Sequence, residues 1–245
     1  MWRMPYVITR NILVLPGIIK KMQYLVKPEI YNEEKCYKYA KYIVDLMHRT
    51  GHIRTTAYGV ENLPKEGGYV MYPNHQGKYD AYGIVGVHEK PCSVVIDEAK
   101  SRGPFIRQVI DLLHGKRMDI HDTRQAMTII LEMIKEVSAG RRFILFPEGG
   151  YVEGRKNGQG EYKPGCFKVS LKTKTPIVPV VLWDSYKVYN SWEFRPVKTE
   201  VHFLKPIPYE EFKDMNTQEI AEMVHKRIQD KLDALAKEKN SLNKK

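Results

Sequence analysis

The pattern in this chain with the clearest chemical meaning is a histidine followed five positions later by an aspartate. His75 and Asp80 come directly after a strand-like apolar run over 68–72. A histidine in a loop at a strand end can act as a general base when a carboxylate holds its other ring nitrogen, because the carboxylate fixes the tautomer and stabilises the imidazolium. These residue types in this position therefore predict general-base chemistry.

The same spacing occurs twice more, so spacing alone does not identify a site. His225 and Asp230 lie in an amphipathic helical stretch, where five residues turn the chain by about 500° and leave the two side chains about 140° apart. His114 and Asp119 lie between two helical stretches, where a structural or a substrate-side role fits as well as a catalytic one. His75 differs because further motifs follow it.

Two downstream motifs accompany His75. A strand-like run over 142–146 leads into Pro147-Glu148-Gly149, at the kind of sheet edge where parallel strands build sites. The apolar run 177–183 contains Pro179, which a central strand avoids unless its backbone is bent or serves a ligand.

With these three blocks the sequence resembles the glycerolipid acyltransferases, in particular the bacterial 1-acyl-sn-glycerol-3-phosphate acyltransferases. The resemblance covers 59–208 and rests on three blocks in the family's order: Asn74-His75 with Asp80, Phe146-Pro147-Glu148-Gly149, and Val178-Pro179-Val180.

The resemblance implies a role for each motif residue. His75 would remove the proton from the acceptor hydroxyl, with Asp80 as its orienting partner, and the oxygen would attack the acyl thioester directly. Asn74 would belong to the substrate site, Glu148 and Gly149 would shape the acceptor site, and Pro179 would form its apolar wall. Such chemistry needs no protein nucleophile, no metal and no cofactor besides the acyl-CoA or acyl carrier protein donor.

The chain departs from the family pattern at two positions. Ile120 stands where the second block usually has a phosphate-binding arginine, and Tyr151 stands where an arginine usually follows the third block. The phosphate of a lysophospholipid acceptor would then need other cations. Proximity in sequence suggests Lys116, Arg117, Arg124 and Arg155.

Three functions stay open at this level. The first is transfer of an acyl group to the sn-2 hydroxyl of 1-acyl-glycerol-3-phosphate, giving phosphatidic acid. The second is the same chemistry on another lysolipid or glycerol-phosphate acceptor, which the two missing arginines favour. The third is a catalytically silent, membrane-associated lipid-binding protein, against which the intact His75, Asp80 and Glu148 argue.

Strand-like and helical stretches alternate along the chain, which predicts a single α/β domain with a mostly parallel sheet and helices on both faces. We expect an acyltransferase domain over 54–245, preceded by an amphipathic helical, membrane-associating segment over 1–53. The expected strands are 54–58, 68–72, 92–96, 142–146, 177–183 and 200–204, and the clearest expected helices are 31–52, 122–139 and one with Asn216 as its N-cap.

The first 27 residues mix apolar side chains with cations. At 100° per residue, Arg3, Arg10 and Lys21 would fall on one basic stripe of an interfacial helix. Pro5 and Pro16-Gly17 favour two short helices over one continuous helix. The segment is either a membrane contact or an arm packed on the core.

Charge and composition narrow the partners. Forty Lys and Arg against 29 Asp and Glu give a net charge of +11, which favours an anionic partner such as a membrane surface or a phosphorylated lipid. Nucleic acid is not expected, because no basic and aromatic recognition module can be identified. Three dispersed cysteines predict neither a metal site nor disulfides, and no apolar run is long enough to span a bilayer. We expect a peripheral protein on the cytoplasmic face of the membrane.

Overall fold

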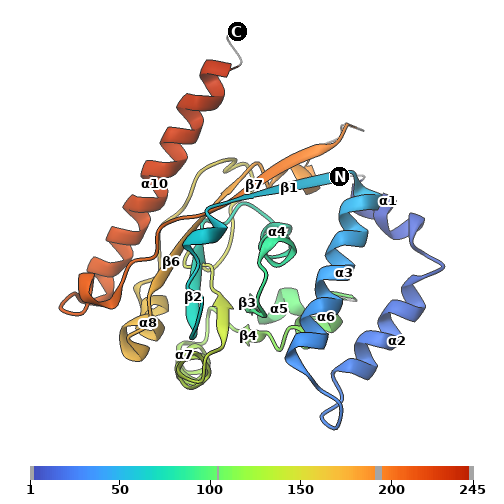
Figure 1. Cartoon of the computed structure of the whole chain (residues 1–245), viewed down its shortest axis with the longest axis horizontal. Helices are drawn as coiled ribbons and strands as arrows, with labels where there is room; N and C mark the ends of the chain where they lie inside the picture. The colour runs from blue at the N-terminus through green and yellow to red at the C-terminus, as the bar shows by residue number, and fades with distance from the viewer. Residues whose placement is uncertain (1–2, 104, 191–194, 243–245) are drawn as a thin grey trace.

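Seven strands form one sheet with helices packed against both of its faces (Figure 1). The computed structural model describes residues 3–103, 105–190 and 195–242. The strands are β1 (Ile53–Tyr58), β2 (Tyr69–Pro73), β3 (Ser93–Asp97), β4 (Lys116–Met118), β5 (Arg142–Ile144), β6 (Ile177–Trp183) and β7 (Val197–Phe203). This architecture confirms the predicted α/β class.

The strand order is β1-β7-β6-β2-β5-β3-β4. All neighbouring strands are parallel except β6 and β7, so β1 and β7 run opposite to the other five. In the parallel set, β2 lies between β6 and β5, which places the loop after β2 at the centre of the sheet's carboxyl edge. That loop begins with Asn74 and His75.

The two central strands are buried on both sides. Every residue of β2 is buried, and so is every residue of β6, whereas in β1 at the sheet edge every second residue is exposed and only Ile53 is buried. Near-continuous apolar runs are typical of strands covered on both faces. Consecutive residues point to opposite faces, so Val70 joins one packing cluster and Met71 the other.

The packing cluster that contains Met71 lies under the two amino-terminal helices, α1 (Arg3–Arg10) and α2 (Leu15–Leu25), and under four further helices on the same face of the sheet. These four are α3 (Glu33–Gly51), α4 (Asp80–Val87), α6 (Ile106–Leu112) and α9 (Lys187–Asn190). The short α5 (Glu98–Ser101) follows β3, and the 3-10 turn η1 (Val60–Asn62) follows β1.

The opposite face carries the second packing cluster, which includes Val70 and Tyr72. Its helices are α7 (Thr123–Ser138), α8 (Lys168–Thr173) and α10 (Thr217–Leu242), with the 3-10 turns η2 (Pro164–Phe167) and η3 (Tyr209–Glu211). In Figure 1, α10 extends beyond the sheet toward the carboxyl terminus. The Asn216 side chain accepts from the Glu219 amide, and the Glu219 carboxylate accepts from the Asn216 amide, which confirms the predicted cap of α10.

The amino-terminal segment forms two helices, as Pro5 and Pro16-Gly17 predicted, but the expected basic stripe is wrong at Arg3. Arg3 is fully buried and donates to the carbonyl of Gly51, the last residue of α3, and to that of Arg195. The carboxyl end of a helix favours a cation because its last carbonyls lack partners within the helix. Arg3 therefore ties α1 to α3.

Two features of the sheet escaped the sequence prediction. Strand β4 has only three half-buried residues, Lys116 to Met118, and two of them are cations. Strand β7 is longer than expected and antiparallel to β6.

Within the described ranges, no helix combines the length and the apolar character needed to cross a bilayer.

Candidate active site

His75 and Asp80 meet at the carboxyl end of β2, as their spacing predicted. Asp80 is the first residue of α4, and the return of the chain into that helix brings its Oδ2 to 2.7 Å from His75 Nδ1. The carboxylate is fully buried, whereas 16% of the His75 side chain is exposed. Because a carboxylate only accepts hydrogen bonds, the contact assigns the ring proton to Nδ1 and leaves the lone pair on Nε2.

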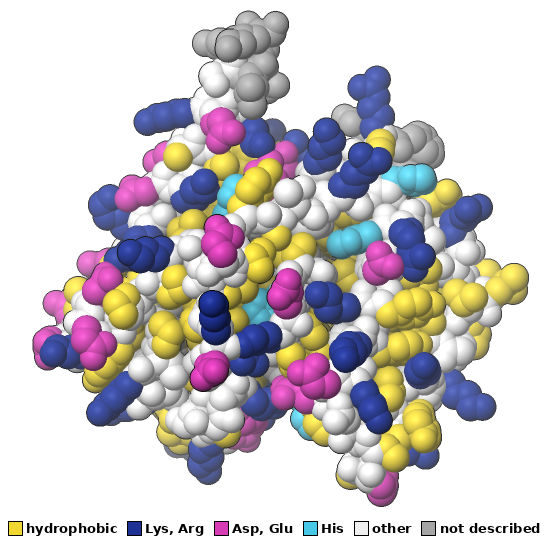
Figure 2. Space-filling model, in the orientation of Figure 1, with side chains coloured by type: hydrophobic (Ala, Val, Ile, Leu, Met, Phe, Trp, Pro, Cys, Tyr) yellow, Lys and Arg dark blue, Asp and Glu magenta, His cyan; other side chains and the backbone are white. Residues whose placement is uncertain are grey.

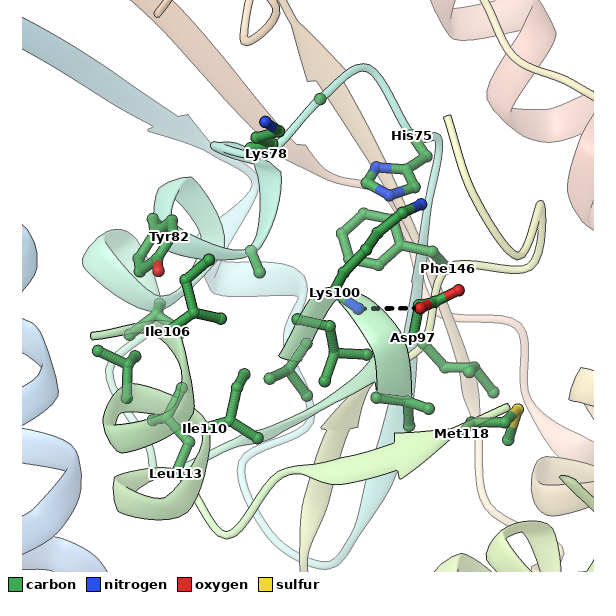
Figure 3. Close-up of a pocket in the computed structure, with 18 of the residues that line it drawn as sticks. His75, Lys78, Tyr82, Asp97, Lys100, Ile106, Ile110, Leu113, Met118 and Phe146 are labelled. Carbon is green, nitrogen blue, oxygen red and sulfur yellow. Dashed lines mark hydrogen bonds between the residues drawn. The ribbon is translucent and has the colours of Figure 1, made fainter. Parts of the chain in front are cut away.

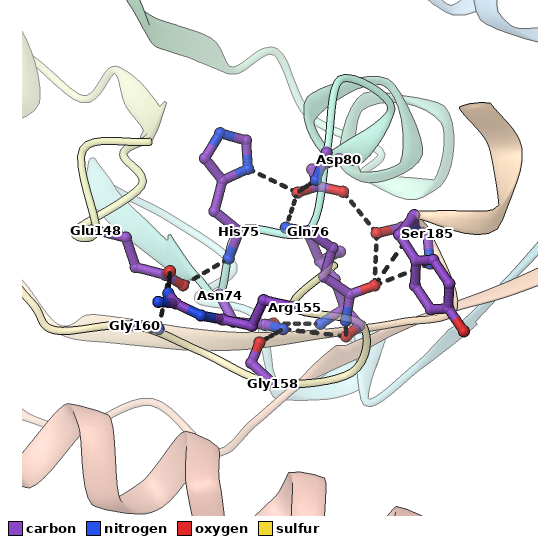
Figure 4. A network of polar contacts seen from close by, with 12 residues as sticks. Asn74, His75, Gln76, Asp80, Glu148, Arg155, Gly158, Gly160 and Ser185 are labelled. Atoms are coloured by element: carbon purple, nitrogen blue, oxygen red, sulfur yellow. Dashed lines mark hydrogen bonds and ion pairs between the residues drawn. The ribbon is translucent and has the colours of Figure 1, made fainter. Parts of the chain in front are cut away.

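Four donors hold the Asp80 carboxylate in place (Figure 4). Besides His75, Oδ2 accepts from the backbone amides of Gln76 at 2.6 Å and Gly77 at 2.9 Å, and Oδ1 accepts from Ser185 Oγ at 2.5 Å. A buried carboxylate needs such partners to offset the loss of water. The same contacts fix the direction in which the carboxylate presents itself to the imidazole.

Aromatic rings confine the imidazole of His75. The ring stacks on Phe146 with centroids 4.1 Å apart and meets the edge of Tyr151 at 5.1 Å. Among the described residues, no hydrogen-bond partner contacts His75 Nε2, and the side chain lines a cavity. The arrangement leaves a positioned base that can take a proton from a molecule in that cavity.

The Glu148 carboxylate binds the backbone of the His75 loop. Its Oε1 accepts from the His75 amide at 2.7 Å, and its Oε2 accepts from the Gly160 amide at 2.8 Å and from Arg155 at 3.1 Å. Burial raises the pKa of Glu148, and the two backbone amides and the charges of His75 and Arg155 oppose that rise. A Cβ on Gly160 would overlap Arg155 Nη1 and lie 2.8 Å from Glu148 Oε2, so a larger residue would displace the two side chains from this contact.

The side-chain amides of Asn74 and Gln76, the residues on either side of His75, join three loops. Asn74 accepts from the Leu182 amide at 2.7 Å and donates to the Gly158 carbonyl at 3.2 Å. Gln76 accepts from the Ser185 hydroxyl at 2.9 Å and donates to the Leu182 carbonyl at 2.6 Å. These bonds connect the His75 loop to the end of β6 and to the loop that follows β5.

Asn157 completes this connection. Its side chain accepts from the Asp184 amide at 2.7 Å and from Gln76 at 3.2 Å, and it donates to the Asp184 carboxylate at 2.8 Å. Sequence reasoning missed Gln76, Asn157 and Ser185 as site residues. The available signals were the amides that flank His75 and the polar residues directly after the apolar strand.

The cavity beside His75 has a volume of about 1040 Å³ and is mainly apolar (Figure 3). Helices α1, α2, α3, α4, α6 and α7 all contribute to its wall, as do the ends of β3 and β4. Four lysines also line it: Lys78, Lys100, Lys163 and Lys168. Such a volume lies at the upper end of the range for small-molecule sites, about 300–1,000 Å³.

Among the predicted substrate-binding residues, only Gly149 lines this cavity. Asn74, Glu148 and Pro179 lie outside its wall: the first two brace the His75 loop, and Pro179 pairs with Tyr72 inside the sheet. The Pro179 carbonyl accepts from Leu204 at the end of the β6–β7 ladder. Proline is thus accommodated where that ladder stops.

The four cations suggested for phosphate binding also lie outside the cavity wall. Lys116 forms ion pairs with Glu132 at 2.8 Å and Glu136 at 2.5 Å, and Arg117 pairs with Asp111 at 2.5 Å. These carboxylates neutralise both cations. Arg155 is held by Glu148, and Arg124 is exposed in the first turn of α7.

The other two histidine-aspartate pairs form no dyad. His114 stacks on Tyr31 with centroids 3.9 Å apart, while Asp119 accepts from the His121 amide. His225 contacts Tyr162, and Asp230 pairs with Lys226 instead. The divergence expected for the pair in α10 is confirmed.

Comparison with known proteins places this geometry in context. A family model described as Acyltransferase matches residues 54–183, which is more than half of the chain. The chain is 27% identical over 133 residues to a 1-acyl-sn-glycerol-3-phosphate acyltransferase of Borreliella burgdorferi, covering 54% of this chain and 52% of the relative. A 1-acyl-sn-glycerol-3-phosphate acyltransferase of Saccharomyces cerevisiae is 27% identical over 182 residues, covering 71% of this chain and 58% of the relative.

The match to curated relatives is partial, whereas the match in fold is nearly complete. The chain spans between about half and three fifths of the length of these two relatives. The crystal structure of the 1-acyl-sn-glycerophosphate (LPA) acyltransferase PlsC from Thermotoga maritima superposes with a TM-score of 0.71. The two sequences are 20% identical, and the match covers 94% of this chain and 93% of the other.

Proposed function

We propose that this chain, which belongs to the acyltransferase family, moves a fatty acyl group from a thioester donor to the sn-2 hydroxyl of 1-acyl-glycerol-3-phosphate. The product would be phosphatidic acid, and the donor would be acyl-CoA or acyl carrier protein. The observation that carries the proposal is His75, whose Nδ1 lies 2.7 Å from Asp80 and whose Nε2 has no hydrogen-bond partner among the described residues and lies beside a largely apolar cavity. The names of the relatives support 1-acyl-glycerol-3-phosphate as the acceptor.

The reaction follows from this geometry. His75 Nε2 accepts the proton of the acceptor hydroxyl while the oxygen forms a bond to the thioester carbonyl carbon. The tetrahedral intermediate then collapses, the carbon–sulfur bond breaks, and the thiolate leaving group takes the proton from the imidazolium. Asp80 stabilises the imidazolium between these two steps. No metal or cofactor is needed in this scheme.

We assign the acceptor phosphate to Lys100 and Lys163. Both side chains line the cavity and are exposed. Each lies close to one of two consecutive glycines, Gly149 and Gly150, in the loop that follows β5. A Cβ on Gly149 would lie 2.9 Å from Lys163 Nζ, and one on Gly150 would lie 4.0 Å from Lys100 Nζ. Lys100 also lies over the Tyr151 ring at 5.5 Å, and that ring contacts His75. The two ammonium groups can therefore hold an anion near the base.

Alanine variants test this assignment. We expect Lys100→Ala and Lys163→Ala each to raise the KM for lysophosphatidic acid between about threefold and tenfold, since exposed charge contacts are weakened by water. Lys172→Ala, on the exposed face of α8, serves as the matched control and should leave KM unchanged. An unchanged KM in the Lys100 and Lys163 double variant would remove both residues from the headgroup site.

A second candidate function is the same chemistry on another lysolipid or glycerol-phosphate acceptor. Ile120 favours it, because an apolar side chain lines the cavity at the position where the resemblance expects a phosphate-binding arginine. Both candidates share His75 and Asp80, so the acceptor must be determined by product analysis.

The amino-terminal helices suggest how such a protein reaches lipid. Leu13 is 93% exposed and Ile12 60% exposed in the turn between α1 and α2, with Ile8 and Val14 each at 50%. Apolar side chains so exposed are typical of contact with a partner or a membrane. We propose that this turn inserts into the cytoplasmic leaflet and that the protein is peripheral.

Mass spectrometry of the products tests the central proposal. Purified protein is incubated with lysophosphatidic acid and, separately, acyl-CoA or acyl-acyl carrier protein. We expect phosphatidic acid with at least one donor, and we expect His75→Ala to lower kcat by about 10²–10⁴-fold. His225→Ala provides the matched control, because His225 has the same spacing to an aspartate but lies on α10.

Each outcome discriminates between the candidates. Product from the wild type that persists at full rate in His75→Ala would contradict the mechanism. No phosphatidic acid, but product with another lysolipid, would favour the second candidate. Lipid binding without any product would favour a silent binding protein.

A further inference from the structure

The cavity beside His75 reaches both faces of the sheet. Val94 and Val95 are consecutive in β3 and therefore point to opposite faces, yet both line the cavity. Val94 belongs to the packing cluster under the amino-terminal helices, and Val95 belongs to the cluster under α7. The apolar lining of the cavity therefore falls into two groups, one from each packing cluster, which we treat as two arms of a cavity that also includes His75.

The first arm, here called the α3 arm, lies on the face of the sheet that carries the amino-terminal helices. Its wall comes from the amino-terminal helices and from α3, α4 and α6, and most of its side chains are buried. They include Val7, Ile18, Val44, Met47, Val85 and Ile110. Figure 3 shows Ile106, Ile110, Leu113 and Tyr82 together on this side of the cavity.

The second arm, here called the α7 arm, lies on the other side of β3. Its wall comes from the end of β4, the first turns of α7 and η2. The side chains are Met118, Ile120, Ala126, Met127, Ile130 and Cys166. Met127 is 40% exposed while Ile130 is buried, so this arm runs from the surface toward the sheet. Figure 3 places Met118 apart from the α6 side chains of the first arm.

The proposed reaction brings two hydrocarbon chains to one base. The donor carries the acyl chain that is transferred, and the lysolipid acceptor carries its own fatty chain beside an anionic headgroup. Two apolar arms that meet near His75 match two chains that must meet at the reacting hydroxyl and thioester.

The position of Lys163, one of the two lysines assigned to the acceptor phosphate, indicates which arm the acceptor chain enters. Lys163 directly precedes η2, the turn whose Cys166 belongs to the α7 arm, and Lys168 directly follows that turn. A ligand whose phosphate lies near these ammonium groups therefore has the α7 arm directly beside its headgroup. Ile120 contributes an apolar wall there, which suits a chain and not a phosphate.

We propose that the α7 arm binds the fatty chain of the lysolipid acceptor, while the α3 arm holds the acyl chain of the donor. This inference rests on the proposed acyltransferase function and specifies where its two substrates lie. Ala126 and Met127 then determine which acceptor chains are accepted, and Ile106 influences the donor chain.

Crossed chain-length profiles test the assignment. KM is measured in detergent micelles for lysophosphatidic acids of short and long chain at a fixed donor, and for short and long acyl donors at a fixed acceptor. The variants are Ala126→Phe in the α7 arm, Ile106→Phe in the α3 arm, and Thr128→Phe as the control on the exposed side of α7. Each methylene group of the fatty chain that the new phenylalanine excludes from the arm should lower the affinity about fourfold.

We expect Ala126→Phe to raise KM for the long-chain acceptor tenfold or more relative to the short-chain acceptor, without changing the donor profile. Ile106→Phe should do the converse, and Thr128→Phe should change neither. A folded Ala126→Phe variant with a wild-type acceptor profile, or with a shifted donor profile, would overturn the proposal. Failure of the wild type to acylate any lysolipid would instead refute the proposed function, and this inference with it.

Discussion

The hydroxyl of Ser185 connects the proposed catalytic pair, His75 and Asp80, to a distant part of the chain. Ser185 is 2% exposed, and its Oγ donates to Asp80 Oδ1 at 2.5 Å, while its amide donates to Gln76 Oε1 at 3.1 Å. Asp80 can orient the imidazole only if its own carboxylate is fixed. We therefore regard Ser185 as a positioning residue for the proposed base.

Removing this hydroxyl should slow turnover without affecting substrate binding. Ser185→Ala leaves one buried carboxylate oxygen without its side-chain donor, which costs about 1–3 kcal/mol. If the loss of this bond disturbs the geometry of His75 and Asp80, kcat should drop about tenfold or more while KM stays constant. Ser185→Thr retains the hydroxyl and should recover most of the rate. Steady-state kinetics of both variants would contradict the role if kcat changed equally in the two, or if only KM changed.

The sequence could predict His75 and Asp80 but not Ser185, and the reason is physical. A loop that enters a helix brings residues five positions apart together by local geometry alone. The contact between Asp80 and Ser185 depends on β6 pairing beside β2, which no local pattern reveals. For the same reason, proximity in sequence suggested Lys116 and Arg117 as phosphate ligands, whereas the fold engages both in ion pairs with acidic neighbours.

At the scale of elements, α4 is fixed at both ends. Its first residue, Asp80, holds the His75 loop, and its C-cap, His88, ties the end of the helix to β2 and to the loop before β3. His88 Nδ1 lies 2.7 Å from the Lys90 carbonyl, so Nδ1 donates and Nε2 accepts from the Tyr69 hydroxyl at 2.8 Å. Only the neutral imidazole can accept the bond from Tyr69, because both ring nitrogens of a protonated histidine are donors.

Burial lowers the pKa of His88 to about 4, which makes the stability of the protein depend on pH. An unfolded histidine binds a proton near pH 6.5, so the unfolded state takes up more protons than the folded state between pH 6.5 and 4. The stabilisation is complete above pH 6.5 and is lost as the pH falls toward 4. From pH 7 to 5 this single group should lower the free energy of unfolding by about 2 kcal/mol.

Urea unfolding of the wild type and His88→Gln checks this expectation. The variant should be less stable at pH 7, because the Tyr69 and Lys90 contacts are altered, but it should lose about 2 kcal/mol less between pH 7 and 5. Other buried histidines titrate in both proteins and cancel in the comparison. Equal losses in the two proteins would show that His88 does not couple folding to pH.

The alternation of apolar runs and helical patterns predicted where the strands and helices lie better than it predicted the relative directions of the strands. Long buried strands such as β2 and β6 stand out in sequence because both of their faces are covered. The three-residue β4 does not, since it is short and carries two cations. The reversal of β1 and β7 depends on pairing between distant segments, which periodicity does not encode.

At the scale of the whole molecule, the proposed membrane contact would draw on two separate attractions, the net charge of +11 and the exposed apolar turn between α1 and α2. Figure 2 shows lysines and arginines over much of the visible face, with hydrophobic side chains gathered on the side where Figure 1 places α1 and α2. The amino-terminal helices are also structural, since Val7 and Ile18 are buried in the core and line the cavity. Deleting them would damage the site, so point variants are the better probe.

Vesicle co-sedimentation of Leu13→Asp should separate the two attractions. Transfer of one such apolar side chain into the bilayer contributes about 1.5–3 kcal/mol, so the variant should bind anionic vesicles at least about tenfold more weakly. Ser241→Asp, an exposed site on α10, makes the same change in charge and should bind nearly as the wild type does.

Added salt should weaken wild-type binding only in part, because a Debye length of about 10 Å at 0.1 M screens the charges but not the buried apolar contact. The residual binding in high salt should vanish in Leu13→Asp. If Leu13→Asp and the wild type retained equal residual binding, the turn between α1 and α2 would not be the membrane contact, and the attraction of this protein to lipid would rest on its charge.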